Sequence, residues 1–326
     1  MPRFRLVDLA ILAFSIAALG ATVEAAQAQQ YPSRPVKIVV PYPPGGTADA
    51  MARIVAEALA RKWDQPVVVE NRAGAGGNLG AELVGRAEPD GYTLLSTPQS
   101  PLVINQHLYA SLRFNPADFV PVVLLGRVPN ALILHPGVRA ASVLELIDHA
   151  KANPEQLTAA TQGVGSSANL TTELFQLTAG VKLRQVPYRG SAPALQDLVA
   201  GNVNLMFDNI GASMALIQGD KLKLVAITAP KRMAALPNVP TVAETLPGFE
   251  SDTWNAIVAP PNTPRAVVDK INADVNEALR QPEAIERLRR LSGEAMGGSP
   301  QAAAAYMRQE TDRWRTVIKT VGITLQ

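Results

Sequence analysis

Loops rich in glycine, serine and threonine are the part of this chain most suited to binding chemistry. The first, Pro43-Pro44-Gly45-Gly46-Thr47-Ala48-Asp49, stands between a short apolar strand pattern and a helical pattern. A helix N-terminus offers free N–H groups and a positive dipole end, so such a loop is suited to holding a carboxylate. Two later loops share this composition: Gln162–Asn169 and Tyr188–Pro193. Any one of them could be an ordinary strand-to-helix turn, but three together favour a shared anion site.

Groupings of side chains typical of catalysis or metal binding are missing from the sequence. His107, His135 and His149 are the only histidines, they lie far apart, and the chain has no cysteine. Metal ligands are therefore poorly supplied, and neither a G-x-S-x-G elbow nor a phosphate-loop motif occurs. The glycines after Asn71 resemble a dinucleotide fingerprint, but Leu79 stands where its last glycine belongs. We therefore expect no cofactor, no metal and no enzymatic turnover.

Charge and the N-terminal residues indicate an exported globular protein. Lys and Arg number 30 against 28 Asp and Glu, and they are spread along the chain. This balance does not suggest nucleic acid or an anionic membrane as a partner. Arg3 and Arg5 precede an apolar stretch, Leu9–Val23, which is followed by the small-x-small site Ala26-Gln27-Ala28. We interpret residues 1–28 as a secretory signal peptide, with a single membrane anchor as the alternative, and expect the mature protein in a bacterial periplasm.

Strand and helix patterns alternate along the rest of the chain in two series. Such alternation predicts an α/β protein, with each of two lobes built on a mostly parallel sheet flanked by helices. The expected strands are Val36–Val40, Val67–Glu70, Tyr92–Ser96, Leu157–Thr161, Arg184–Pro187, Val203–Phe207 and Leu222–Thr228. A long apolar run covers Val120–Gly126 and Ala131–His135, and a short apolar stretch covers Trp254–Ala259. The expected helices are Asp49–Lys62, Asn78–Ala87, Val143–Ala152, Leu170–Ala179, Ala194–Ala200, Pro264–Leu279 and Pro300–Val321.

The chain is expected to cross between the two lobes twice. Turn-forming residues near Pro129-Asn130 and near Pro247-Gly248-Phe249 are typical of a hinge. The segment after Phe249 has too little strand pattern to form a third domain, so it is expected to return to the first lobe. Lobe 1 would then comprise residues 29–129 and 250–326, and lobe 2 residues 130–249.

Five stretches of the sequence, taken in their order along the chain, carry a resemblance to a known family. They are YPSRPVKIVVPYPPGGTADAMAR, VVVENRAGAGGNLGAELVGRAEPDGYTLL, FVPVVLLGRVPNALILHP, VPYRGSAPALQDLVAGNVNLMFDN and LPNVPTVAETLPGFE. In these stretches the chain resembles the Bug family of extracytoplasmic solute receptors, the binding proteins of tripartite tricarboxylate transporters. The resemblance implies a periplasmic binding protein fold of the second type, whose two lobes close on the ligand by a hinge motion. It also implies a receptor that captures a small carboxylate and delivers it to membrane permease subunits, and we expect it to be a monomer.

The resemblance further implies where the ligand is held. In the family, backbone amides and ordered water from two loops hold the anion, and a salt bridge is not the main anchor. Carried over position by position, the implied ligand-binding residues are Pro44, Gly45, Gly46, Thr47, Asp49, Gly163, Ser166, Ser167, Tyr188, Ala192 and Asp208.

Two departures from the family leave the ligand open. Asn169 stands where many members carry a histidine, and Ser96–Ser100 lacks the histidine that many place just after it. The ligand could therefore be a di- or tricarboxylate, an acidic amino acid or an aromatic acid. Two other functions also stay open: a ligand-dependent co-receptor for a sensor protein, and a periplasmic enzyme acting on a carboxylate substrate.

Overall fold

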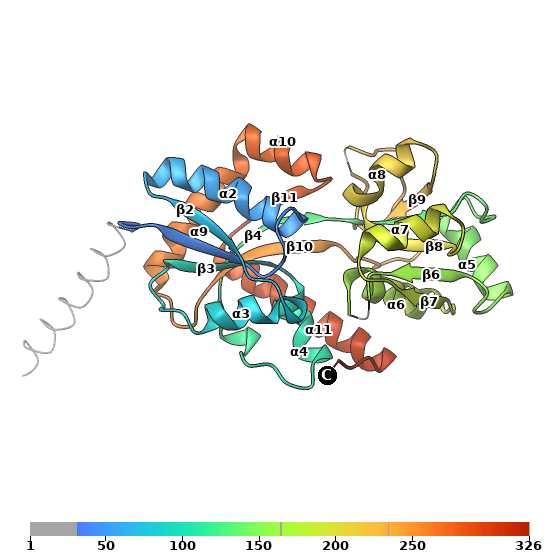
Figure 1. The fold of residues 1–326 in the computed structure, drawn as a ribbon, viewed down its shortest axis with the longest axis horizontal. Coiled ribbons are helices and arrows are strands. Elements are labelled where there is room, and N and C mark those ends of the chain that lie inside the picture. Colours follow the sequence, from blue (N-terminus) through green and yellow to red (C-terminus); the bar gives the residue numbers. More distant parts are fainter. Residues whose placement is uncertain (1–30, 164, 234, 326) are drawn as a thin grey trace, which may run out of the picture.

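The computed structural model describes residues 31–163, 165–233 and 235–325, which form two lobes (Figure 1). The signal peptide expected at residues 1–28 lies outside the described residues. Within the described part of the chain, no helix has both the length and the apolar character needed to cross a membrane.

Lobe 1 contains a six-stranded mixed sheet. Its strands are β1 (Val36–Val40), β2 (Val67–Asn71), β3 (Thr93–Pro98), β4 (Val120–Val128), β10 (Thr253–Ala259) and β11 (Glu294–Gly297). Across the sheet they follow the order β11-β4-β10-β3-β1-β2. β1 pairs in parallel with β2 and β3, whereas β10 runs antiparallel to β3 and β4, and β11 antiparallel to β4. Four strands therefore point one way, and the two reversed strands come from the C-terminal part of the chain.

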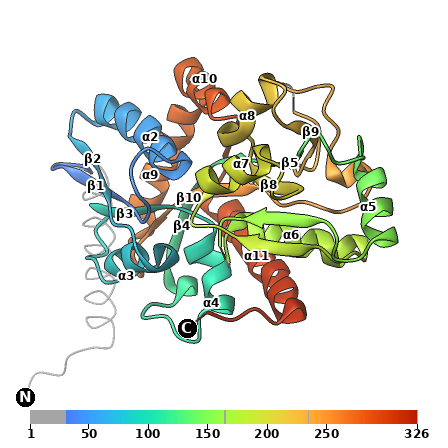
Figure 2. The same cartoon turned by 45° about the vertical axis from the view of Figure 1, so that its right-hand side comes forward.

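Helices cover both faces of this sheet, as the turned view in Figure 2 also shows. They are α2 (Thr47–Trp63), α3 (Asn78–Gly85), α9 (Arg265–Arg280), α10 (Pro282–Arg290) and α11 (Pro300–Val321), with short turns η1 (Ala75–Gly77), η2 (Ser100–Ile104), α4 (Asn105–Leu108) and η3 (Pro116–Asp118). Alternation along β1 explains the two layers, since successive side chains of a strand point to opposite faces. Ile38 packs in one core with residues of α2 and α9, and Val39 in another with residues of α3 and α11.

Lobe 2 contains a five-stranded sheet with the order β7-β6-β8-β5-β9. Its elements are β5 (Asn130–Leu134), α5 (Val143–Ala152), β6 (Thr158–Thr161), α6 (Ser167–Ala179), β7 (Arg184–Pro187), α7 (Ser191–Val199), β8 (Leu205–Asn209), α8 (Ile210–Gln218), β9 (Lys223–Ile227) and η4 (Val242–Glu244). β6 pairs in parallel with β7 and β8, and only β5 is reversed, antiparallel to β8 and β9. The loops that lead from β6, β7 and β8 into helices therefore meet at one edge of the sheet.

The two passages of the chain between the sheets are hydrogen-bonded to each other. Pro129 separates β4 from β5, and the second passage runs from the end of β9 to the start of β10. The Asn130 N–H donates to Thr228 Oγ1 at 2.9 Å, and Asn130 Nδ2 donates to the carbonyl of Ser251 at 2.7 Å. A small set of residues thus fixes how the two passages lie against each other.

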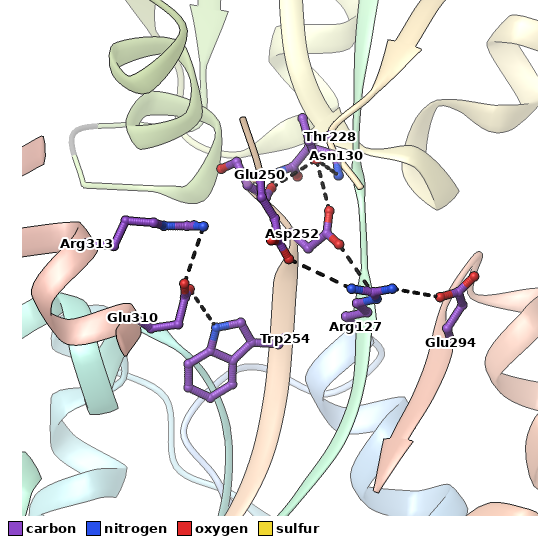
Figure 3. Close-up of polar contacts among 10 residues, drawn as sticks. Arg127, Asn130, Thr228, Glu250, Asp252, Trp254, Glu294, Glu310 and Arg313 are labelled. Atoms are coloured by element: carbon purple, nitrogen blue, oxygen red, sulfur yellow. Dashed lines mark hydrogen bonds and ion pairs between the residues drawn. The ribbon is translucent and has the colours of Figure 1, made fainter. Parts of the chain in front are cut away.

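A cluster of charged side chains lies beside these passages (Figure 3). Arg127, near the end of β4, faces three carboxylates: Glu250 at 3.8 Å, Asp252 at 3.8 Å and Glu294 at 3.3 Å. Arg127 Nη2 donates a hydrogen bond to Glu294, whereas its contacts with Glu250 and Asp252 are too long for hydrogen bonds. Arg127 is therefore shared among three carboxylates.

Asp252 is the buried member of this cluster, with a side chain only 1% exposed. Its carboxylate accepts a hydrogen bond from Thr228 Oγ1 at 3.2 Å. Burial raises the pKa of Asp252 to about 7, against the opposing effect of Arg127 and with a further rise from Glu250. Thr228 and Arg313 act in the lowering direction. The crossing between the lobes thus contains a carboxyl that ionises near neutral pH.

Candidate functional site

A cavity of about 730 Å³ lies between the lobes. This volume falls within the range of small-molecule sites in proteins, about 300–1,000 Å³. Both lobes contribute to its wall: Tyr42, Pro43, Pro44, Gly46, Thr47, Ala48, Gly76, Pro98, Ser100, Asn105, Leu108, Tyr109, Thr253, Asn255 and Leu325 from lobe 1, and Gln162, Gly165, Ser166, Ser167, Ser191 and Asn209 from lobe 2.

Four helices begin at this cavity. The lining includes the N-cap or first residue of each: Gly46 and Thr47 of α2, Ser166 and Ser167 of α6, Ser191 of α7 and Asn209 of α8. The N-termini of α2, α7 and α8 have no side-chain cap, so side chains do not occupy their first N–H groups. The positive ends of four helices therefore converge on one space, which favours an anion.

The described residues that line the cavity include no charged side chain. Attraction for an anion must therefore come from backbone dipoles and N–H groups instead of a salt bridge. Much of the remaining wall is apolar or aromatic: Tyr42, Pro43, Pro44, Pro98, Leu108, Tyr109 and Leu325. The described part of the chain also contains no cluster of three or more His, Asp or Glu that could hold a metal ion. The wall suits a ligand with an acidic group and an apolar body.

The loop between β1 and α2 is held in place by Asp49. This buried carboxylate accepts hydrogen bonds from the Gly45 N–H at 3.0 Å, from Arg53 Nε at 2.9 Å and from Asn71 Nδ2 at 3.0 Å. Arg53 is the main cause of an Asp49 pKa of about 2, and the Gly45 and Asn71 bonds lower it further. Asp49 is not part of the cavity wall but fixes the loop, while Gly46 and Thr47 line the cavity.

Replacing Asp49 with alanine should lower the free energy of unfolding by about 2 kcal/mol at pH 7. A pKa of about 2 in the folded protein, against 3.8 ordinarily, means that this stabilisation is present above about pH 4 and is lost as the pH falls toward 2. Urea unfolding of both proteins between pH 2 and pH 7 measures it. Asp269→Ala is the matched control, because Asp269 also pairs with an arginine four residues away but is 49% exposed. An Asp49→Ala effect that persists unchanged at pH 2 would contradict the assignment.

In lobe 2, Asn169 shapes the loop before α6. Asn169 Oδ1 accepts from the Gly165 N–H at 2.8 Å, and Asn169 Nδ2 donates to Gln185 Oε1 at 2.7 Å. Gly165 has a φ of +78°, and a Cβ atom there would lie 2.9 Å from Leu108 Cδ1. Glycine therefore allows this loop to approach α4 of lobe 1 closely. Asn169 itself is not part of the cavity wall.

Asp208 joins two of the lobe 2 loops. It accepts hydrogen bonds from Gln162 Nε2 at 2.6 Å and from Ser191 Oγ at 2.6 Å, and both donors line the cavity. The Asn209 N–H donates to the same carboxylate at 2.9 Å. Burial raises the Asp208 pKa to about 6, although these three hydrogen bonds lower it. Asp208 lies behind the wall and positions the side chains that form it.

The eleven expected ligand-binding residues take different places in the structure. Five line the cavity: Pro44, Gly46, Thr47, Ser166 and Ser167. Gly45, Asp49, Gly163 and Asp208 hold the loops through hydrogen bonds of their backbone or carboxyl groups. The Tyr188 hydroxyl donates to Asp197 Oδ2 at 2.7 Å, and Ala192 lies exposed in the first turn of α7. Neither of these two lines the cavity.

Sequence reasoning did not single out several residues of the wall. Gln162 and Ser191 belong to loops whose composition had pointed to a site, so a signal for them existed. Thr253 and Asn255 of β10 and Leu325 near the C-terminus had none, because nothing local ties a strand residue or a chain end to a distant cavity.

Comparison with known proteins identifies the family. Residues 51–323 match the family model described as the tripartite tricarboxylate transporter family receptor. The R. palustris protein Rpa4515, solved with adipate, is 37% identical with a TM-score of 0.80, covering 90% of this chain and 99% of that one. The periplasmic binding protein BugD is 34% identical with a TM-score of 0.76, covering 91% and 100%. MatC (Rpa3494) from Rhodopseudomonas palustris, solved with malate, is 33% identical with a TM-score of 0.75, covering 88% and 100%.

These matches span both lobes and nearly the whole length of each solved protein. They agree with the two-lobed fold. The chain therefore belongs to the tripartite tricarboxylate transporter receptor family, a family of periplasmic solute-binding receptors that includes BugD.

Proposed function

We propose that this receptor captures a small carboxylate between its lobes and delivers it to the permease subunits of a tripartite tricarboxylate-type transporter. The observation that carries the proposal is the convergence of four helix N-termini on a cavity whose described wall has no charged side chain. A carboxylate matches such a site because N–H donors and helix dipole ends attract and compensate negative charge. Adipate and malate, bound in the two R. palustris relatives, are both dicarboxylates and support the same chemistry here.

The ligand is held by one loop from each side of the cavity. Pro44, Gly46 and Thr47 form the lobe 1 contact, and Ser166 and Ser167 the lobe 2 contact. Gly45, Asp49, Gly163 and Asp208 complete the site through their hydrogen bonds, and Tyr188 and Ala192 belong to it through the neighbouring loop and first turn of α7. Lobe 1, residues 29–129 and 250–326, closes on lobe 2, residues 130–249, by rotation about the two passages.

The protein acts as a monomer in the periplasm after export. The basic and apolar N-terminal sequence followed by Ala26-Gln27-Ala28 supports a cleaved signal peptide over residues 1–28. Delivery of the ligand, and not its conversion, is the role of the mature protein.

A panel of acids tests this function on the purified mature protein. Citrate, adipate, malate, glutamate, benzoate and nicotinate are compared by thermal unfolding with the corresponding neutral amides. An acid present at one hundred times its Kd should stabilise the folded protein by about 2.7 kcal/mol, whereas its amide should not. Proton NMR should find the acid chemically unchanged after incubation. If no acid raises the melting temperature, the proposed function is wrong.

A further inference from the structure

Asn255 is a buried amide in the cavity wall. It lies on β10 and is 1% exposed. Among the described residues, neither its Nδ2 nor its Oδ1 has a hydrogen-bond partner. Burying an amide without hydrogen-bond partners costs free energy of folding. Native proteins rarely retain such a group unless a water, ion or ligand forms hydrogen bonds with it. Asn255 is therefore a group in this wall that a ligand would satisfy.

The other amides of the wall are different. Asn105 Nδ2 donates to the Gly76 carbonyl at 3.0 Å, and Gln162 Nε2 donates to Asp208 at 2.6 Å. Asn209 Oδ1 accepts from Thr253 Oγ1 at 3.3 Å. Each of these side chains has a protein partner, so the lack of partners is particular to Asn255.

The strand pairing around Asn255 is irregular. Its antiparallel neighbour on β3 is Pro98, which has no N–H to donate. On the other side, the pairing with β4 shifts register between Asn255 and Ala256. Such bulges often re-aim a side chain next to a functional site.

Asn255 also lies at a defined place relative to the helix ends. Thr253, two residues earlier on the same strand face, has its hydroxyl 3.5 Å from Ser167 Oγ at the start of α6. Two residues along a strand span about 7 Å. A ligand whose carboxylate sits at the α6 N-terminus would therefore reach Asn255 with a group several ångströms from that carboxylate.

We propose that Asn255 selects carboxylates that carry, several ångströms from the acid group, a group that both donates and accepts a hydrogen bond. This inference rests on the proposed function. A second carboxylate only accepts, so it would leave Asn255 Oδ1 unpaired, and an ammonium only donates, so it would leave Nδ2 unpaired. A hydroxyl or a primary amide satisfies both atoms.

Isothermal titration of matched ligands tests the inference on the full mature protein. The series comprises benzoate with its 3-hydroxy, 4-hydroxy and 4-carboxamide derivatives, and glutarate with 3-hydroxyglutarate. At least one hydroxyl- or amide-bearing member should bind about tenfold more tightly than its parent acid, and the hydroxy and carboxamide arms separate the two groups. Parent acids that bind as tightly as every derivative would overturn the inference and leave the proposed function intact.

Two variants assign the preference to this residue. Asn255→Leu keeps the branching and the number of heavy atoms of the side chain, and removing a buried amide without partners should not harm folding. In this variant the ratio between the affinity of the derivative and that of its parent acid should fall from about tenfold to below about twofold. Asn202→Leu, at an exposed position in the turn after α7, is the control and should keep the advantage. A preference that survives in Asn255→Leu contradicts the inference, and absence of binding by any acid overturns it together with the proposed function.

Discussion

Replacing Gly46 with valine should weaken carboxylate binding on the order of 100-fold while costing the fold only about 1 kcal/mol. Gly46 is the N-cap of α2, has an extended backbone with φ −84°, and lines the cavity. A Cβ atom there would have no atom within 4 Å, so the folded protein has room for the side chain. The valine would instead occupy the space through which an anion reaches the uncapped N–H groups of α2, where each charge-assisted hydrogen bond contributes about 1.5–3 kcal/mol.

Calorimetric titration with a binding acid, together with urea unfolding without ligand, separates the two effects of Gly46→Val. Gly80→Val is the control with the opposite pattern. A Cβ at Gly80 would lie 2.7 Å from Pro41 Cβ and 3.0 Å from the Arg72 carbonyl oxygen, so this substitution should mainly destabilise the fold. If Gly46→Val costs stability as heavily as Gly80→Val and leaves affinity unchanged, the first loop is a structural turn and not a ligand contact.

Elements with strong local signals were predictable from the sequence. α5 and α11 have the bounds expected from their apolar periodicity, Val143–Ala152 and Pro300–Val321. Each is preceded by a serine whose hydroxyl accepts from a backbone N–H of the first turn, Ser142 and Ser299. Where periodicity and capping agree, sequence and structure coincide.

Elements that depend on distant partners were not predictable. α8 was missed because Ile210–Gln218 is apolar on nearly every side and shows no polar face to mark a helix. β11, Glu294–Gly297, has two exposed residues and a glycine, and it is a strand because β4 offers unpaired backbone groups along its edge. The contacts that make α8 a helix and β11 a strand come from other parts of the fold, so neither element could be recognised from its own residues.

The residues of the candidate site also fall into a group that the sequence predicted and a group that it did not. Glycine and serine loops between strands and helices identified the N-termini of α2 and α6, because the chemistry of a βα loop is local. Asp49 was expected among the ligand-binding residues, and in the structure it pairs with Arg53 four residues later and is not part of the described cavity wall. Asn255 could not be predicted, because its place in the wall depends on β10 lying between β3 and β4 in the sheet.

Asp252→Asn should stabilise the ligand-free protein at pH 8 by about 2–4 kcal/mol and by much less near pH 4. The Asp252 pKa rises from 3.8 to about 7, chiefly because the carboxyl is buried. Below about pH 4 the carboxyl is protonated in both states. Between about pH 4 and 7 the unfolded chain loses this proton first, so stability falls as the pH rises, and above 7 the penalty is constant. Asparagine keeps an oxygen for Thr228 and carries no charge, so the penalty disappears.

Urea unfolding at intervals from pH 4 to pH 8 measures this difference, and Glu294→Gln is its control. Glu294 contacts the same arginine at 3.3 Å but is 45% exposed, so its replacement should change the free energy of unfolding by at most about 0.5 kcal/mol. Arg127 keeps Glu250 and Glu294 as neighbours when Asp252 is neutral, and is therefore not left as an isolated charge. Loss of stability at pH 8 would mean that the attraction between Arg127 and Asp252 exceeds the cost of burying the carboxylate. A gain independent of pH would mean that Asp252 does not ionise in this range.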